Sequence, residues 1–406
     1  MTFQTLTLVS LLALIGPILS LPRAWYVPVI LGEIAAGVAF GTTGTGTLHP
    51  HEPTFTFLAN VGFALVMFVS GSHVPVRDPR LAAALGIGAL RAVAVGVVSV
   101  LIAVLIARGF GTGHSELYAV LISSSSAALV LPIVDSLHLT GVPVLQLVPQ
   151  VALADIACIV ALPLVIDPPH AGRAALGTLA VLATAGVVFL LLRYLERSGR
   201  RRRAHRLSEQ RRLALELRVS LIILFALCAL ATSTHVSIML AGFSFGIAVA
   251  AVGEPRRLAR QLFALTEGFL GPLFFVWVGA TLDLRELGQH PSYIALGILL
   301  GVGAVVAHGA MRATGQPFRF GALASAQLGV PVAAVTVGLQ LHVLKPGEPS
   351  ALILGALISM AAAAASAAFA PRTPDKPAAP ADDTKAGDTK AGDTKAGDTK
   401  AGDTTA

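Results

Sequence analysis

The chain has 406 residues, of which 55% are hydrophobic and 13% are charged. Soluble domains carry about a quarter charged residues, so this composition excludes an ordinary soluble globule and indicates a protein embedded in a bilayer. Much of the formal net charge of +7 lies in one basic loop at residues 193–218, between two apolar segments. Such a loop favours the cytoplasmic side and anionic lipid as a partner, and we expect no nucleic acid.

Apolar runs of about 20 residues, the length needed to cross about 30 Å of hydrocarbon, recur along the chain. In chain order they cover residues 5–20, 27–41, 55–71, 81–107, 117–137, 144–166, 174–192, 220–232, 236–252, 262–282, 292–311, 320–343 and 351–369. The sequence therefore predicts an all-α polytopic membrane protein with about 13 transmembrane helices.

The loops between these runs differ in positive charge. With the amino terminus outside, most arginines near span ends, including those of the basic loop, fall on one side, which the positive-inside rule makes the cytoplasm. After Pro371 the composition changes to Asp, Thr, Lys, Ala and Gly in a repeated pentapeptide, which has little apolar surface to bury. We therefore expect a membrane domain at residues 1–371, which includes the basic loop 193–218, and a disordered low-complexity cytoplasmic tail at 372–406.

Two of the predicted spans contain groups that compete with or break helical hydrogen bonding. These are Ser123, Ser124, Ser125 and Ser126 before Pro132 in the fifth span, and Gln327 before Pro331 in the twelfth. Discontinuous helices at corresponding places in two halves are typical of inverted-repeat membrane transporters with a site near the midplane. The alternative is a pair of ordinary proline kinks.

Asp155 lies near the middle of the sixth predicted span, with no other charge nearby in sequence. An ionisable group at this depth costs several kcal/mol unless it is paired, solvated or neutralised. We expect it to bind either a proton or an alkali cation, Na+ or K+, with the four serine hydroxyls and the carbonyls freed by broken helices as supporting oxygen ligands. The alternative is a carboxyl group held neutral by a hydrogen bond between helices.

Glu33, Glu267, His308 and Gln327 are further candidates in or near predicted spans, and we treat them as auxiliary residues. The two glutamates can instead be interfacial, and His308 can be a packing residue rather than a proton relay. Arg91 is expected to extend to the lipid headgroups. The sequence contains no enzyme constellation, and we expect neither an enzymatic activity nor a cofactor.

Residues 27–370 resemble the cation:proton antiporter superfamily, in its bacterial sodium/proton and potassium-efflux branch. Segments 28–37 and 58–71 look like two of its early spans, 123–132 is similar to its first crossing helix, and 272–283 matches its most recognisable signature. The pair Ala154-Asp155 matches its ion-binding pair. The resemblance implies a homodimer in a bacterial inner membrane, with inverted repeats, two crossed discontinuous helices, and a core domain that moves against a dimerisation domain.

Four positions depart from that pattern. The polar residue before the aspartate is Ala154, the lysine of some members is replaced by Gly303, an acidic position is His73, and a Gly-Glu pair ends in Val330. With Asp155 as the one carboxyl group at the midplane, we expect electroneutral exchange of one cation for one proton. The alternatives are a proton-coupled carrier of an organic solute, which suits a roomier apolar cavity, and a non-transporting membrane sensor.

Overall fold

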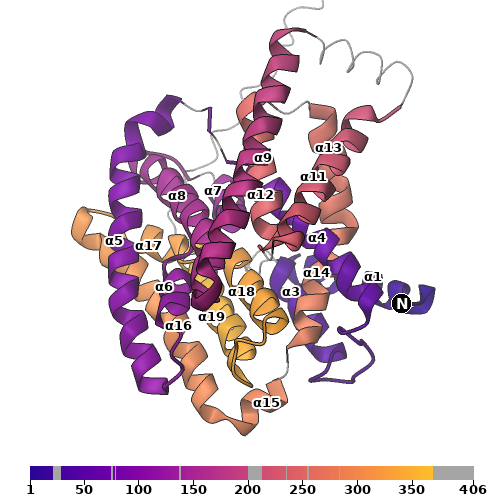
Figure 1. Cartoon of the computed structure of the whole chain (residues 1–406). Helices are drawn as coiled ribbons and strands as arrows, with labels where there is room; N and C mark the ends of the chain where they lie inside the picture. Colours follow the sequence, from indigo (N-terminus) through magenta and orange to yellow (C-terminus); the bar gives the residue numbers. More distant parts are fainter. Residues whose placement is uncertain are drawn as a thin grey trace, which may run out of the picture. The chain divides into compact units, whose positions relative to one another are not determined.

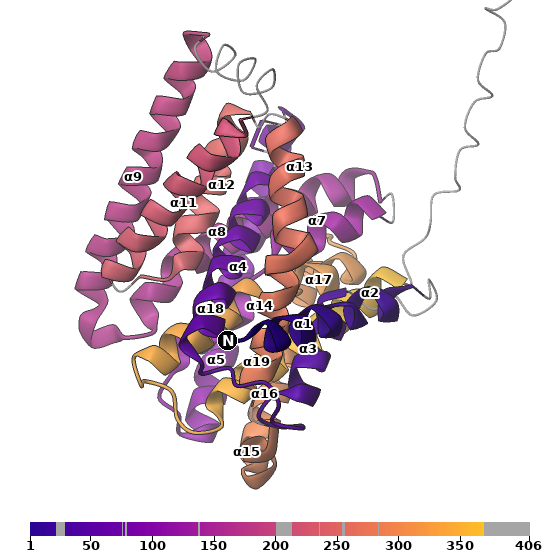
Figure 2. The ribbon, with the colours of Figure 1, turned by 90° about the vertical axis from the view of Figure 1, so that its right-hand side faces the viewer.

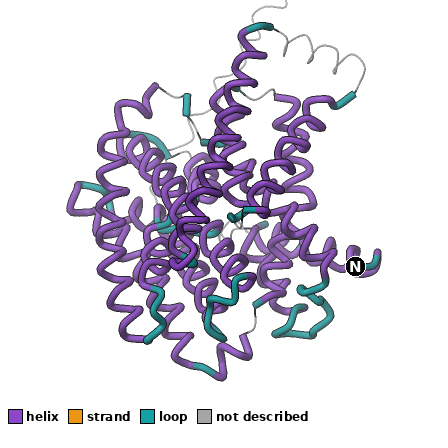
Figure 3. The backbone as a smooth tube through the Cα atoms, viewed as in Figure 1, coloured by secondary structure: helices purple, strands orange, loops and turns teal. Residues whose placement is uncertain are grey.

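The computed structural model describes residues 1–21, 29–74, 76–77, 79–136, 139–199, 213–234, 236–253, 256–282 and 284–368. Every regular element in these ranges is helical (Figure 1; Figure 3). Ten helical stretches within them are long and apolar enough to cross a membrane, and two shorter apolar helices, Val29–Phe40 and Ile238–Val252, accompany them. The predicted tail and residues 200–212 of the basic loop lie outside the described residues.

The helices follow the apolar runs of the sequence. The first half contains α1 (Phe3–Ala13), α2 (Ile15–Ser20), α3 (Val29–Phe40), α4 (Pro53–Ser72), α5 (Pro79–Phe110), α6 (Ser115–Ser123), α7 (Ala127–Ser136), α8 (Val142–Val165) and α9 (Ala171–Arg197). The second half contains α11 (Leu215–Ser233), α12 (Ile238–Val252), α13 (Arg256–Leu265), η2 (Thr266–Leu270), α14 (Gly271–Thr281), α15 (Leu284–Gln289), α16 (Pro291–Gly309), η3 (Ala310–Thr314), α17 (Phe318–Ala324), α18 (Gly329–Gln340) and α19 (Glu348–Ala368). The prediction of an all-α polytopic membrane protein is confirmed, because a helix or a pair of helices covers each predicted run.

The helices pack in two groups. The first, which we call the broken-helix group, consists of α5–α8 and α16–α19, and its members contact one another across the two halves of the chain. The second, the α4–α12 group, consists of α1–α4 and α11–α14. Helix α9 contacts α8 of the first group and α11 and α12 of the second, and Figure 2 shows it beside α11 and α12.

Helices α3 and α14 of the α4–α12 group approach so closely that glycine is required at the contact. A Cβ atom added to Gly37 would lie 2.1 Å from the carbonyl oxygen of Val276, and one added to Gly279 would lie 2.0 Å from that of Ile34. Small residues at such contacts let helix backbones approach in a bilayer, where close packing rather than the hydrophobic effect holds helices together.

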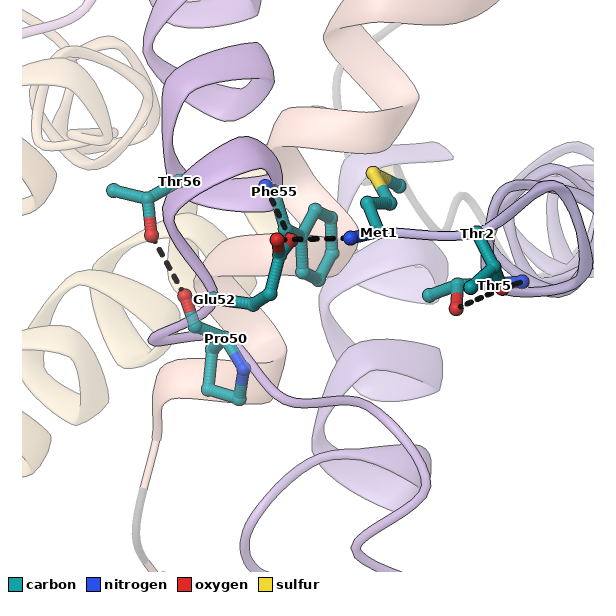
Figure 4. Close-up of polar contacts among 7 residues, drawn as sticks. All are labelled: Met1, Thr2, Thr5, Pro50, Glu52, Phe55 and Thr56. Atoms are coloured by element: carbon teal, nitrogen blue, oxygen red, sulfur yellow. Dashed lines mark hydrogen bonds and ion pairs between the residues drawn. The ribbon is translucent and has the colours of Figure 1, made fainter.

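The start of α4 is fixed by a polar cluster outside the membrane spans. Glu52 accepts a hydrogen bond from the Phe55 N–H at 2.9 Å and forms an ion pair with the Met1 amine at 2.8 Å (Figure 4). These contacts, the amine first, lower the pKa of the Glu52 carboxyl group to about 2. The Pro50 carbonyl accepts from the Trp277 indole N–H at 2.8 Å. The cluster therefore joins the beginning of the chain, α4 and α14.

Arg91 differs from its sequence-based expectation. Its side chain is buried, and its Nε donates to the Thr314 hydroxyl at 2.9 Å while one Nη donates to the Thr314 carbonyl at 3.2 Å. It therefore joins α5 to the end of η3 instead of extending to the headgroups. A residue 223 positions away supplies the partner, which no local pattern around Arg91 reveals.

Gly279→Ala is expected to lower the thermal stability of the protein, because the added methyl group overlaps the backbone of α3. Overpacking of this kind costs about 1–3 kcal/mol. Melting of the detergent-solubilised protein measures the effect. Gly96→Ala in α5 is the matched control, since its Cβ would meet nothing within 4 Å. Equal melting temperatures for the two variants would show that the α3–α14 contact can accommodate an added methyl group.

Candidate functional site

Two helices of the broken-helix group are interrupted, and the interruptions meet. Helix α6 ends at Ser123 and α7 begins at Ala127, while α17 ends at Ala324 and α18 begins at Gly329. The backbone N–H of Ser126 donates to the carbonyl of Ala326 at 2.8 Å, so each extended segment contacts the other. The prediction of two crossed discontinuous helices is confirmed, and the alternative of simple proline kinks is wrong.

Side chains add two further links between the interruptions. The Ser124 hydroxyl donates to the Gln327 side-chain oxygen at 2.6 Å, and the Ser125 hydroxyl donates to the Ala324 carbonyl. All of these residues are buried. Backbone groups that leave a helix inside a membrane need partners within the protein, since no lipid tail supplies them. Each interruption provides such partners for the other.

Asp155 projects from α8 to the start of α7. Its carboxyl group is buried, and Oδ2 accepts a hydrogen bond at 2.9 Å from the N–H of Ala127, the first residue of α7. Within the described residues this is its one hydrogen bond, so Oδ1 has none there. The amino end of a helix carries a partial positive charge and free N–H groups. The broken helix therefore places a stabilising dipole beside a carboxylate inside the bundle.

The four serines differ in what they offer a cation. Ser123 donates to the Ala119 carbonyl of its own helix at 2.8 Å, Ser124 and Ser125 donate to the opposite interruption, and Ser126 contributes its backbone N–H. A hydroxyl group that donates its proton still has lone pairs on its oxygen. The described residues contain no cluster of three or more His, Cys, Asp or Glu. One carboxylate together with neutral oxygens on the adjoining helix interruptions is a donor set that suits an alkali cation rather than a transition metal.

The other sequence candidates lie in different places. Gln327 is part of the crossing, through Ser124. Glu33 and Glu267 line one cavity. His308 is buried in α16, where Nδ1 bonds to the Ala304 carbonyl at 2.9 Å and Nε2 has no partner among the described residues. Its hydrogen bond is thus to its own helix and not to Asp155.

Apolar side chains surround Gly303, one of the four departures from the superfamily pattern. A Cβ atom on Gly303 would lie 3.0 Å from Cγ2 of Ile102 and 3.5 Å from Cδ1 of Ile122, the residue before Ser123. Ala154 is itself buried. Isoleucine side chains therefore occupy the space beside Gly303, where some members of the superfamily have a lysine.

Sequence reasoning missed a buried amide pair close to Asp155. Gln316 donates from Nε2 to Oε1 of Gln150 at 2.9 Å, which joins α8 to the turn before α17. Gln150 lies five residues before Asp155, in a span whose other polar side chains are Gln146 and Asp155. A polar residue at that position was the available signal. Its partner, 166 residues away, follows only from the fold.

Residues 10–371 match the family described as "Sodium/hydrogen exchanger, transmembrane". Because the match covers most of the chain, this protein belongs to the sodium/hydrogen exchanger family and is a multi-pass membrane protein. The superfamily resemblance drawn from the sequence is thereby confirmed.

Two curated relatives and one solved structure are similar to the chain. The putative Na(+)/H(+) antiporter YjbQ of Bacillus subtilis is 25% identical over 383 residues, covering 87% of this chain and 61% of its own. The glutathione-regulated potassium-efflux system protein KefC of Salmonella typhi is 29% identical over 352 residues, covering 82% of this chain and 55% of its own. The chain thus spans less than two thirds of these relatives. The sodium proton antiporter MjNhaP1 of Methanocaldococcus jannaschii has the same fold, with a TM-score of 0.63, 14% identity and coverage of 90% of this chain and 95% of its own.

The link between Ser124 and Gln327 is testable by a double-mutant cycle. Ser124→Ala and Gln327→Leu are each expected to destabilise the protein by about 1–3 kcal/mol. The first removes the donor to the buried Gln327 side-chain oxygen, and the second removes the acceptor of the buried Ser124 hydroxyl. The double variant is expected to cost less than the sum of the two. Unfolding in mixed micelles measures all four proteins.

Ser359→Ala is the control for this cycle, because its buried hydroxyl donates to its own helix, at Ala356, and not across the crossing. Strict additivity of Ser124→Ala and Gln327→Leu would mean that the two side chains are not coupled.

Proposed function

We propose that this protein is a secondary active transporter that exchanges a monovalent cation, Na+ or K+, for protons. The observation that carries the proposal is the buried Asp155 carboxyl group at the amino end of α7, beside the crossing of two broken helices. Membership of the sodium/hydrogen exchanger family supports it. So do the names of the relatives, a putative Na(+)/H(+) antiporter and a potassium-efflux system protein.

Asp155 is the residue at which cation and proton compete. The Asp155 oxygen Oδ1, which has no hydrogen bond among the described residues, can bind either a proton or a monovalent cation. A second positive charge in a low-dielectric site would be uncompensated. The hydroxyl oxygens of Ser124 and Ser125 and the carbonyls at the two interruptions complete the cation's coordination. The N–H of Ala127 stabilises the carboxylate when neither is bound.

Exchange by alternating access requires two bodies that move against each other. The broken-helix group, which contains the site, is the mobile core domain in our proposal, and the α4–α12 group is the dimerisation domain of a homodimer. Within unit 1–372 the two groups are each densely packed, while α4 with α7 and α8 with α12 make small contacts between them. Small contacts between packed groups suit rigid-body motion.

The proposed location is a bacterial inner membrane, with the amino terminus outside and the carboxy terminus in the cytoplasm. The charge asymmetry of the loops supports this orientation. Anionic lipid is the proposed partner of the basic loop at residues 193–218. The packed isoleucines beside Gly303 do not support the organic-solute alternative, which relied on a roomy cavity there.

Asp155→Asn is expected to abolish cation–proton exchange and to leave the protein folded, because the amide oxygen can still accept from Ala127 but the side chain no longer titrates. Dissipation of an imposed pH gradient in proteoliposomes, with Li+, Na+, K+ and Rb+ tested in turn, measures exchange. Asp167→Asn, in the turn after α8, is the control. Exchange at the wild-type rate by Asp155→Asn would exclude Asp155 as the shared site.

A site with a single carboxylate predicts electroneutral exchange. In each half-cycle the carboxylate carries one monovalent cation or one proton, so the complex that moves is neutral. The exchange rate is expected to be independent of an imposed membrane potential, and a cation jump on a solid-supported membrane is expected to give no sustained current. His308→Ala should leave both results unchanged. A robust current that disappears in His308→Ala would instead identify His308 as a second titrating group.

A further inference from the structure

A buried polar junction lies where α5, α8 and the turn before α17 meet. It consists of Arg91 of α5, Gln150 of α8, and Thr314 and Gln316 on either side of Gly315. Arg91 donates to the hydroxyl and the carbonyl of Thr314, and the Gln316 amide donates to that of Gln150. The junction therefore connects α8, the helix with the site carboxyl group, to the beginning of the second broken helix.

The backbones at this junction are also close together. A Cβ atom on Gly88, three residues before Arg91 on α5, would lie 2.9 Å from the backbone nitrogen of Gln150. Gly315 has a φ of +81°, a left-handed conformation that favours glycine, and it separates the residue that bonds to α5 from the one that bonds to α8. The close approach and the turn leave little room for α8 to shift against α5.

Helix α8 is weakened on both sides of Asp155. Pro149 and Pro163 lie inside the helix, and a proline supplies no N–H to the carbonyl four residues earlier. The segment between them, which carries Asp155, is therefore held less firmly by the remainder of its own helix. Gln150 is the first residue of that segment after Pro149, and its bond to Gln316 gives the segment a partner outside α8.

The amide pair is costly for stability. Gln150 is 1% exposed and Gln316 is 2% exposed, and each leaves one amide atom, Nε2 of Gln150 and Oε1 of Gln316, without a hydrogen bond among the described residues. An apolar pair of the same shape would avoid that cost. Stability alone therefore does not account for the pair. A hydrogen bond between helices adds a fixed distance and direction, which apolar packing does not impose.

The amide pair and Asp155 hold α8 at two points. Gln150 precedes Asp155 by five residues, which separates the two side chains by about 7.5 Å along the helix axis and by about 140° around it. One contact reaches Gln316 before the second broken helix, and the other reaches Ala127 at the start of α7. Together they fix the shift of α8 along its axis and its rotation about that axis.

We propose that Gln150 and Gln316 are positioning residues of the cation site, which hold α8 in the rotation at which Asp155 meets the amino end of α7. The inference rests on the proposed exchange function. Within the described residues neither amide bonds to Asp155, so the pair acts on the cation only through the position of the carboxyl group.

The first test uses nearly isosteric variants in proteoliposomes. Gln150→Met and Gln316→Met are each expected to raise the apparent KM for Na+ or K+ about 3- to 10-fold, the factor that corresponds to the net free energy of one hydrogen bond. The maximal rate per folded protein should change little, because Asp155 still titrates. Gln146→Met is the matched control, since Gln146 lies one turn earlier on α8 and is only partly buried. Wild-type KM values in both variants would overturn the proposal.

The double variant separates positioning from a merely structural role. With both amides replaced, no buried amide atom of the pair is left unpaired, so thermal stability is expected to recover relative to either single variant. The KM is expected to stay as high as in the single variants, since all three proteins lack the same hydrogen bond. A KM that returned to the wild-type value together with the melting temperature would overturn the positioning role.

The last test does not depend on transport. Amide hydrogen–deuterium exchange of the peptide that covers the start of α7, read by mass spectrometry, reports on the Ala127 N–H that bonds to Asp155. Deuterium uptake there is expected to be faster in Gln150→Met and in Gln316→Met, and unchanged in Gln146→Met. Equal uptake in all four proteins would overturn the positioning role. A wild-type protein that does not exchange cations for protons would overturn only the proposed function.

Discussion

The bilayer gives a chain no hydrogen-bonding partners, so a helix can be interrupted at membrane depth only where the protein itself supplies them. In this protein two interruptions supply each other. Ser126 bonds to Ala326, Ser124 bonds to Gln327, and Ser125 bonds to Ala324. Either interruption alone would leave backbone groups unpaired at membrane depth, which is costly. The crossing is therefore one structural unit, to which both halves of the chain contribute.

The free helix ends at the crossing create the electrostatic setting of Asp155. A carboxylate in the middle of α8 would otherwise be an isolated buried charge, which is costly. The start of α7 provides both an N–H group and the positive end of a helix dipole. The N–H group and the helix dipole stabilise the carboxylate, but they do not supply a full positive charge. In the proposed exchange, a cation or a proton supplies the remaining positive charge.

Composition and local pattern predict most of the fold. The membrane spans, the broken helices and Asp155 can each be recognised from residues within a single apolar run of about 20 residues. The local sequence pattern does not predict which side chains far apart in the sequence contact each other. The amide pair of Gln150 and Gln316, and the contact of Arg91 with Thr314, join residues 166 and 223 positions apart. Glu33 and Glu267 are recognisable in the sequence as acids in apolar runs. Their shared cavity is not, because it forms only when several helices, among them α3 and η2, come to line the same space.

The buried acids of this chain differ in how many hydrogen-bond partners they have among the described residues. Glu348 is fully buried, and its two oxygens accept from the Tyr118 hydroxyl, the ring of His114 and the Lys345 N–H, at 2.6, 2.6 and 2.9 Å. That carboxylate has all the partners it needs and joins α6 to α19. Glu33 is nearly as buried and has none among the described residues, while Asp155 has one. A buried carboxylate without partners destabilises the fold. For Asp155, the cation or proton that it binds in the proposed exchange offsets this cost.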